Sequence, residues 1–201
     1  FVPVLALIRC FDFSQGTGRL DVLGCLVPDD LVVADVGCGT GYLAAALGRR
    51  VRRVICVDAS PAMLDRARAN LADSTAAIDL RAGTLEQLPL DDGEVDAACA
   101  HMVLHHLTEP RLGLAEMARI VRPGGTVACL DLLPHNEAWM HEAMADTRLG
   151  VDPATLIEDM GAVGLSDIRL ETVSDRYVVE HAVNGRPVQL PLFLLRGRRG
   201  S

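Results

Sequence analysis

Lysine is absent from this chain of 201 residues, aromatic residues are scarce, and positive charge is in deficit. We attribute the use of arginine for all 19 basic residues to compositional bias and not to chemistry. The formal net charge of −8 argues against a nucleic-acid backbone as partner. Only 3% of the residues are aromatic although 50% are apolar, so the core must be built from Leu, Val, Ala and Ile.

Long apolar runs are also missing, which argues against a membrane-spanning helix, and the first residues lack the pattern of a secretion signal. The six cysteines form no C-x-x-C pair and fit no zinc signature. Cys56, Cys99 and Cys129 lie in apolar segments that we predict to be strands, where buried free thiols are expected. We therefore predict a cytoplasmic protein in a reducing compartment, without a membrane partner.

The sequence does contain a glycine turn between two apolar segments. Residues 31–36 are typical of a buried strand, and the alternating glycines of the Gly37–Gly41 segment let the backbone approach a ligand closely because they lack a Cβ atom. A helix-compatible segment covers 42–49, and a second apolar strand, 54–57, ends at Asp58. A carboxylate there can accept both hydroxyls of a ribose. This order favours a nucleotide-like cofactor at the first crossover of an open α/β sheet.

The spacing of the glycines separates two classes of nucleotide. Dinucleotide-binding proteins use G-x-G-x-x-G and aim a helix N-terminus at a pyrophosphate. Here the pattern is G-x-G-x-G, and Asp35 stands just before it. A carboxylate at that position repels a pyrophosphate but suits a ligand that carries an amino group and a sulfonium. The pattern therefore disfavours an NAD-dependent dehydrogenase.

At this point the sequence resembles motif I of the class I S-adenosylmethionine (SAM) dependent methyltransferases, D-x-G-C-G-T-G. The resemblance covers roughly residues 31–133 and extends more weakly to the end of the chain. It rests on motifs that occur in the family's order: Asp35–Gly41, Ser60–Leu64 after the acid Asp58, Leu85–Pro89, Val103–Leu107 and Arg122–Gly125. The resemblance implies SAM as cofactor and S-adenosylhomocysteine (SAH) as its product.

The same resemblance implies which residues contact the cofactor. They are Asp35, Gly37, Gly39, Gly41, Asp58, Ala59, Met63, Thr84, Leu85 and Ala100. Asp58 would bind the ribose and Asp35 the amino-acid part of SAM, although Asp58 could instead cap the next helix and Met63 could be ordinary core. Thr84 stands where the family usually has an aspartate for the adenine amino group, so the backbone around Leu85 would have to take over part of this recognition.

The alternation of segments and the family resemblance together predict an α/β fold. We expect a Rossmann-like, seven-stranded, mostly parallel sheet with helices on both faces and a C-terminal antiparallel hairpin. The strands are expected near 31–36, 54–57, 78–81, 95–100, 126–131, 167–173 and 188–196, and the helices near 41–49, 61–72, 110–121 and 153–163. Residues 1–30 are expected to form a helical cover or lid, and residues 31–201 the methyltransferase domain.

Substrate chemistry is expected beyond the carboxyl ends of the fourth and fifth strands, on the same edge as the cofactor. This edge would carry polar and aromatic side chains: His101, His105, His106, Asp131, His135 and Trp139. We predict His101, His105 and His135 as catalytic candidates, with His101 as the first choice for a general base if the acceptor must lose a proton. His105 or His106 could instead simply pack. The types of His101, His135 and Asp131 suit a metal, but spacing along the chain does not test ligands that come from separate loops, and we predict no metal.

The segment Asp131–Glu142, together with Arg148–Gly150, is similar to methyltransferase domains fused to regulators of the arsenic-resistance-repressor type. The match is partial, and most of the cysteines lie in predicted strands, so arsenite is disfavoured and a small-molecule acceptor is predicted. The alternatives are a non-catalytic SAM-binding sensor or dimerisation module, and a C-methyltransferase like those of the quinone pathways. A homodimer remains open as the oligomeric state.

Overall fold

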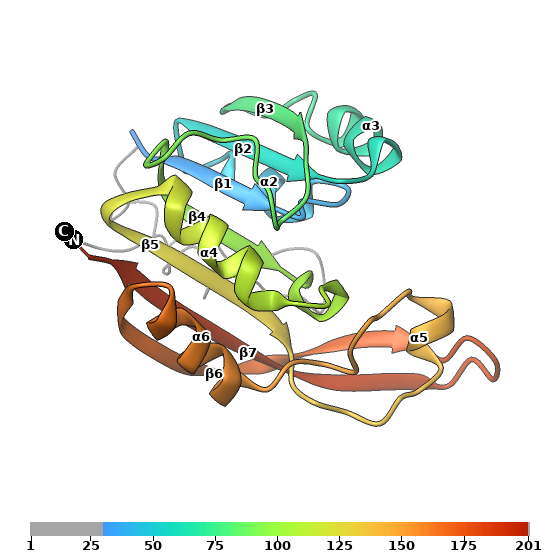
Figure 1. Cartoon of the computed structure of the whole chain (residues 1–201). Coiled ribbons are helices and arrows are strands. Elements are labelled where there is room, and N and C mark those ends of the chain that lie inside the picture. The colour runs from blue at the N-terminus through green and yellow to red at the C-terminus, as the bar shows by residue number, and fades with distance from the viewer. Residues whose placement is uncertain (1–29, 201) are drawn as a thin grey trace.

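The computed structural model describes residues 30–200, which form a seven-stranded sheet with the order β3-β2-β1-β4-β5-β7-β6 (Figure 1). Strands β1 to β5 are parallel, β7 is antiparallel to β5, and β6 pairs antiparallel with β7 at the edge. The strands are β1 Val32–Val36, β2 Arg53–Asp58, β3 Ala77–Ala82, β4 Val95–His101, β5 Val121–Leu132, β6 Leu165–Glu180 and β7 Pro187–Arg199. The predicted fold class and the C-terminal antiparallel pair are confirmed.

Helices cover both faces of the sheet, and each face has its own apolar core. One core joins the sheet to α2 and α3, and the other joins it to α4, α6 and the segment 85–90. The helices are α2 Tyr42–Leu47, α3 Pro61–Asn70, the 3-10 turn η1 Leu104–His106, α4 Pro110–Ile120, α5 Met140–Ala143 and α6 Pro153–Ala162. Among residues 30–200, no helix has the length and apolar character that crossing a membrane requires.

Two helices begin at residues that the sequence marks as caps. The side chain of Ser60 accepts a hydrogen bond from the Met63 backbone N–H, and Pro61 is the first residue of α3. Asp152 caps α6 in the same way, ahead of Pro153. Proline is well placed there because the first helical N–H has no partner inside the helix.

The register of the parallel strands aligns the residues that follow them at one edge of the sheet. Val36 of β1 pairs with Val57 of β2 on one side and with Ala100 of β4 on the other. His101 of β4 pairs with Leu130 of β5. The glycine turn after β1, Asp58, His101 and the residue after Leu130 therefore lie at the same carboxyl edge, where open α/β sheets bind their ligands.

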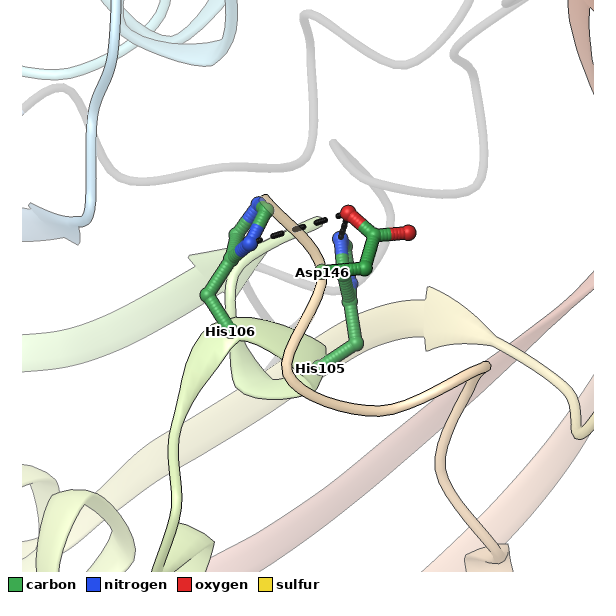
Figure 2. A group of neighbouring side chains, drawn as sticks. All are labelled: His105, His106 and Asp146. Atoms are coloured by element: carbon green, nitrogen blue, oxygen red, sulfur yellow. Dashed lines mark ion pairs between the residues drawn. The ribbon is translucent and has the colours of Figure 1, made fainter. Parts of the chain in front are cut away.

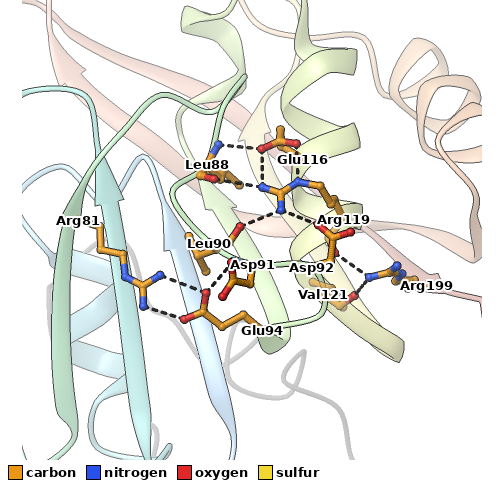
Figure 3. Close-up of polar contacts among 10 residues, drawn as sticks. All are labelled: Arg81, Leu88, Leu90, Asp91, Asp92, Glu94, Glu116, Arg119, Val121 and Arg199. Carbon is orange, nitrogen blue, oxygen red and sulfur yellow. Dashed lines mark hydrogen bonds and ion pairs between the residues drawn. The ribbon is translucent and has the colours of Figure 1, made fainter.

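The connection from β3 to β4 contains no helix, and arginine side chains hold it in place (Figure 3). Arg119 near the end of α4 donates hydrogen bonds to the carbonyl oxygens of Leu88 and Leu90, and it pairs with the carboxylate of Glu116. The backbone N–H of Leu88 donates to the same Glu116 carboxylate at 2.8 Å. Arg81 at the end of β3 pairs with Glu94 at the other end of the connection. The connection is thus attached at several points along its length.

The observed elements differ from the prediction in three places. Strand β6 runs to Glu180, well past the predicted end near 173, and the four-residue helix α5 was not predicted. Strand β5 begins at Val121 directly after α4, with an irregular register where it meets β4. The predicted cover over residues 1–30 lies outside the described residues except for Asp30, and the predicted domain boundary stays a prediction.

Candidate active site

The glycine turn after β1 is closed by backbone hydrogen bonds to β2. The N–H groups of Gly37 and Cys38 both donate to the carbonyl oxygen of Val57, at 2.8 and 3.0 Å. Gly37 has φ of 71°, and a Cβ atom there would overlap the Val103 side chain from the loop after β4. Gly39 has φ of 52°, but a Cβ atom there would meet open space. The turn therefore requires glycine at 37 for packing, and at 39 it presents backbone to an open region.

Asp58 joins the end of β2 to this turn. One of its carboxylate oxygens accepts the N–H of Gly39 at 2.8 Å, and the other accepts the N–H of Ser60 at 2.9 Å. Each oxygen has two lone pairs, so each retains one for a further donor. The position predicted for ribose binding thus has the acceptors it needs, and the same carboxylate also fixes the glycine turn.

Asp35 is a buried carboxylate with no basic side chain paired to it among residues 30–200. Its residue is 1% exposed, and neither oxygen has a hydrogen bond of ordinary geometry among the described residues. Burial raises the pKa of Asp35 to about 7, the backbone amide of Ala44 opposes part of this rise, and the charge of Asp58 adds to it. A buried acid without a partner is costly to ionise. A cationic ligand at this edge would stabilise its charged form.

The other predicted cofactor residues lie around the same edge of the sheet. Ala100 is buried in β4, Ala59 is exposed directly after β2, and Met63 is partly buried in α3. Thr84 is exposed and forms an isolated bridge with Gln87, and Leu85 is buried. The segment of Thr84 and Leu85 belongs to the connection that Arg119 holds. Their contacts with a cofactor stay a prediction.

His101 ends β4 beside the glycine turn. Its ring stacks on that of Tyr42, the first residue of α2, with the centroids 6.2 Å apart. Burial lowers the pKa of His101 to about 4, and the charge of Asp131 only partly opposes this. The ring is therefore neutral at pH 7, and a proton on it would be held weakly.

His105 lies in η1 and is held by Asp131 at the end of β5. The distance from Nδ1 of His105 to the Asp131 carboxylate is 2.6 Å, and both residues are buried. The same carboxylate accepts the backbone N–H groups of Leu104 and Leu132. Burial lowers the pKa of His105, but the hydrogen bond to Asp131 and the charges of Asp131 and Asp146 outweigh it, so the pKa is raised. Asp131 thus fixes both the position and the tautomer of this ring.

Asp146, in the segment between α5 and α6, meets this histidine from the opposite side (Figure 2). One of its carboxylate oxygens lies 3.6 Å from Nε2 of His105 and 3.7 Å from Nδ1 of His106. Nothing in the sequence pattern around Asp146 indicates this role, because it sits in an irregular segment about 40 residues away along the chain. Its contacts with η1 are the part of the site that sequence reasoning missed.

His135 and Trp139 follow β5, and neither belongs to the group of His105, His106 and Asp146. Nδ1 of His135 accepts the backbone N–H of Glu137 at 3.3 Å. Burial lowers the pKa of His135, with Asp146 and Glu137 partly opposing. Trp139 contacts the turn between β6 and β7, with its ring centroid 4.8 Å from that of His181. The predicted histidines therefore occupy distinct environments along one edge of the sheet.

The cysteines in the described part of the chain are free and buried, as predicted. They are Cys38, Cys56, Cys99 and Cys129. Burial raises the pKa of the Cys99 and Cys129 thiols, which keeps them protonated. Cys10 and Cys25 lie outside the described residues.

Comparison with known proteins matches residues 34–129 to the family model described as "Methyltransferase domain". An uncharacterized methyltransferase of Mycobacterium tuberculosis is 42% identical over 93 residues, which are 46% of this chain and 36% of that protein. The malonyl-[acyl-carrier protein] O-methyltransferase of Serratia marcescens is 36% identical over 126 residues, 60% of this chain and 48% of that one. The chain thus spans about half or less of the length of these two curated relatives.

The match runs through the glycine turn, the acid at the end of β2 and β4. Residues 34–129 are therefore similar to a methyltransferase domain. The crystal structure of the YcgJ protein from Bacillus subtilis has the same fold, with a TM-score of 0.70, 18% sequence identity, and coverage of 88% of this chain and 94% of that one. The similarity to methyltransferase domains fused to arsenic-type regulators is not shown by these comparisons and stays a prediction.

SAM is the cofactor of this methyltransferase domain, and the described residues fit it. The unpartnered carboxylate of Asp35 lies buried in a strand that leads into the turn. The open space at Gly39 leaves room for a ligand against the backbone. A ligand with a positively charged amino group and a sulfonium supplies the countercharge that Asp35 lacks.

Proposed function

We propose that this protein transfers a methyl group from SAM to a small-molecule acceptor by in-line displacement. The observation that carries the proposal is the pair of carboxylates at the glycine turn, Asp58 with acceptor capacity to spare and Asp35 buried without a partner. A pyrophosphate-bearing dinucleotide would be repelled at Asp35. The NAD-dependent class is therefore not supported by this edge of the sheet.

When bound, SAM supplies an electrophilic methyl group on a sulfonium. Asp58 would accept the two ribose hydroxyls, and Asp35 would receive the amino group directly or through water. The segment around Leu85 would lie against the adenine, held there by the contacts of Arg119 with the neighbouring carbonyls. Much of the catalysis of methyl transfer comes from alignment of donor and acceptor. The domain would therefore act mainly by holding both in line for the displacement.

The acceptor would meet the cofactor at the carboxyl ends of β4 and β5. His101 lies there as a neutral ring, and it can take a proton in the transition state, although its low pKa makes it a weak base. His105 is better placed than His101 to carry a proton, because Asp131 orients the ring through Nδ1 and stabilises the imidazolium. The name of the Serratia relative, an O-methyltransferase, favours oxygen as the methylated atom. Cytoplasmic location and a homodimer remain predictions.

Calorimetric titration of the purified chain with SAM, SAH and NADH tests the cofactor part of the proposal. We expect SAM and SAH to bind with micromolar affinity and NADH not to bind. Asp58→Ala should weaken SAH binding by about 100-fold or more, because two charge-assisted hydrogen bonds of about 1.5–3 kcal/mol each are lost. Asp65→Ala, at an exposed aspartate of α3 that pairs with Arg68, is the matched control. Binding of NADH, or unchanged binding by Asp58→Ala, would contradict the proposal.

Turnover separates an enzyme from a non-catalytic SAM sensor. Release of SAH is measured with a panel of small hydroxyl, carboxyl and amine acceptors, for the wild-type chain and for His101→Ala. Loss of turnover with unchanged SAH affinity in His101→Ala would support its role as a base. A chain that binds SAM but methylates no member of a broad panel would favour the sensor.

A further inference from the structure

His105, His106 and Asp146 bring three metal-ligating side chains together outside the cofactor turn (Figure 2). The ligand atoms are Nε2 of His105, Nδ1 of His106 and a carboxylate oxygen of Asp146, all within 4.8 Å of one another. The two histidines come from η1 and the aspartate from the segment between α5 and α6. Two separate parts of the chain therefore converge on one point.

The carboxylate of Asp146 is incompletely hydrogen-bonded among the described residues. Its side chain is 1% exposed, and its second carboxylate oxygen is buried without a hydrogen-bond partner among the described residues. The first oxygen is 3.6 Å from Nε2 of His105, which is too long for a hydrogen bond. Burying a carboxylate in this state is costly, and a cation between these atoms would remove the cost.

His105 is prepared as a ligand by its other nitrogen. Because Asp131 holds Nδ1 at 2.6 Å, the neutral ring keeps its proton on Nδ1, and a metal ion between Nε2 and Asp146 would take the place of the second proton that the charged ring carries there. A carboxylate that accepts from a metal-ligating histidine in this way is the usual outer partner of such sites, where it fixes the tautomer and raises the basicity of the ring. His105 and Asp131 are thus already arranged as a metal-ligating histidine and the carboxylate that orients it.

The distances suit a first-row transition metal. Four ligands at about 2.0–2.1 Å from a tetrahedral zinc ion are about 3.4 Å from one another. The distances from Asp146 to His105 and His106 are 3.6 and 3.7 Å, within a few tenths of an ångström of this value, and the ligand atoms of the two histidines lie within 4.8 Å of each other. Closing the site therefore requires the His106 ring to approach His105 by up to about 1.4 Å. Nδ1 of His106 also lies 3.2 Å from the carbonyl oxygen of Ala145 and would leave this contact to bind a metal. Its ring is exposed and packs against the ring of His105, with the centroids 4.2 Å apart.

We propose that His105, His106 and Asp146 bind a divalent transition-metal ion of the Zn²⁺ type. Two histidines and one carboxylate leave at least one position of the metal open to another ligand. The site lies at the carboxyl edge of β4 and β5. If the proposed methyl transfer is correct, the open position would take an oxygen of the acceptor and lower its pKa, which lessens the need for a base.

Metal binding is tested without SAM or acceptor, so its outcome does not depend on methyl transfer. The full chain is stripped with chelator, dialysed against Zn²⁺, and analysed for bound metal; Co²⁺ is then titrated and followed by its visible absorption. We expect one equivalent of Zn²⁺ per chain. Asp146→Asn and His106→Ala should weaken binding by more than about 100-fold, since even changes in the supporting shell cost about 10- to 100-fold. His181→Ala, a histidine beside Trp139, should bind as the wild type does.

Thermal unfolding with and without Zn²⁺ covers the case in which a variant is destabilised. The wild type and His181→Ala should gain melting temperature from Zn²⁺, while Asp146→Asn should remain folded and gain none. The proposal is overturned if the wild type binds no Zn²⁺ at 100-fold excess of metal over a chain concentration of about 10 µM. Retention of binding by Asp146→Asn, or a Co²⁺–thiolate band that shows binding through Cys38, would overturn it as well.

Discussion

The buried carboxylate of Asp35 makes cofactor affinity depend on pH in a way that can be calculated. With its pKa raised to about 7, Asp35 is about 1% ionised at pH 5. If SAH binds through its amino group to the charged form alone, its apparent dissociation constant is about fivefold higher at pH 6 than at pH 7, where half of Asp35 is ionised, and about 50-fold higher at pH 5. The ligand's own amino group, with an ordinary pKa of about 7.7–8.0, stays protonated over this window.

The assay is calorimetric titration with SAH at pH 5, 6 and 7, in two buffers that differ in ionisation enthalpy. At pH 6 the wild type should release about 0.9 proton on binding, because Asp35 begins almost fully protonated and ends ionised. Asp35→Asn should bind more weakly at pH 7, with no dependence on pH from this position. Asp65→Asn, at an exposed site, should keep the wild-type slope. Equal affinity of the wild type at pH 5 and 7, or an equal slope in Asp35→Asn, would refute the reasoning.

The same shift has a consequence for the stability of the protein without cofactor. The pKa of Asp35 is higher in the folded protein than its ordinary value of 3.8, so the folded state binds more protons than the unfolded state between pH 4 and 7. Its contribution to stability is therefore greatest below pH 4 and falls as pH rises through 7, by about 4 kcal/mol in all. Asp35→Asn should unfold at higher urea than the wild type at pH 8, and SAH should reduce this difference.

Four further predictions use urea unfolding at pH 7.5, with SAH titration for the glycine variants. Gly37→Ala should cost about 2 kcal/mol or more and abolish SAH binding, because positive φ and overlap with the valine of the next loop act together. Gly39→Ala should cost only about 1 kcal/mol while weakening SAH binding, because its Cβ enters open space. Arg119→Leu should cost about 2 kcal/mol and release the β3–β4 connection. Leu114 is buried in α4, and Leu114→Ala should lower the free energy of unfolding by about 2–5 kcal/mol. Leu112→Ala, on the exposed face of the same helix, should lower it by less than about 0.5 kcal/mol. Equal losses for the two variants would contradict the packing of α4.

The elements that sequence reasoning located are those whose signal is local. Apolar runs bounded by turns predicted the parallel strands, and Ser60 and Asp152, each followed by proline, predicted where two helices begin. The glycine turn and Asp58 could be predicted because each is marked by the residues directly next to it in the sequence. These features require no knowledge of distant contacts.

The rest depends on contacts between segments far apart in the chain. Asp146 meets η1 only after β5, α5 and the intervening loop have been placed, and no periodicity marks its segment. Arg119 fixes carbonyl groups about 30 residues away, which leave no trace in the sequence pattern. The second half of β6 was missed because Tyr177 and Val179 are only partly buried and alternate with exposed residues. Its strand character comes from pairing with β7.

The position of β7 has a consequence for how the chain folds during synthesis. This strand is the last in sequence, yet it lies between β5 and β6 (Figure 1). A nascent chain that has not yet emerged past residue 187 has β5 with an open edge and β6 with no neighbour in the sheet. Such edges are templates for association with other chains. Completion of the sheet must therefore wait for the final strand, and premature termination or stalling before it should lead to aggregation and not to a shorter folded protein.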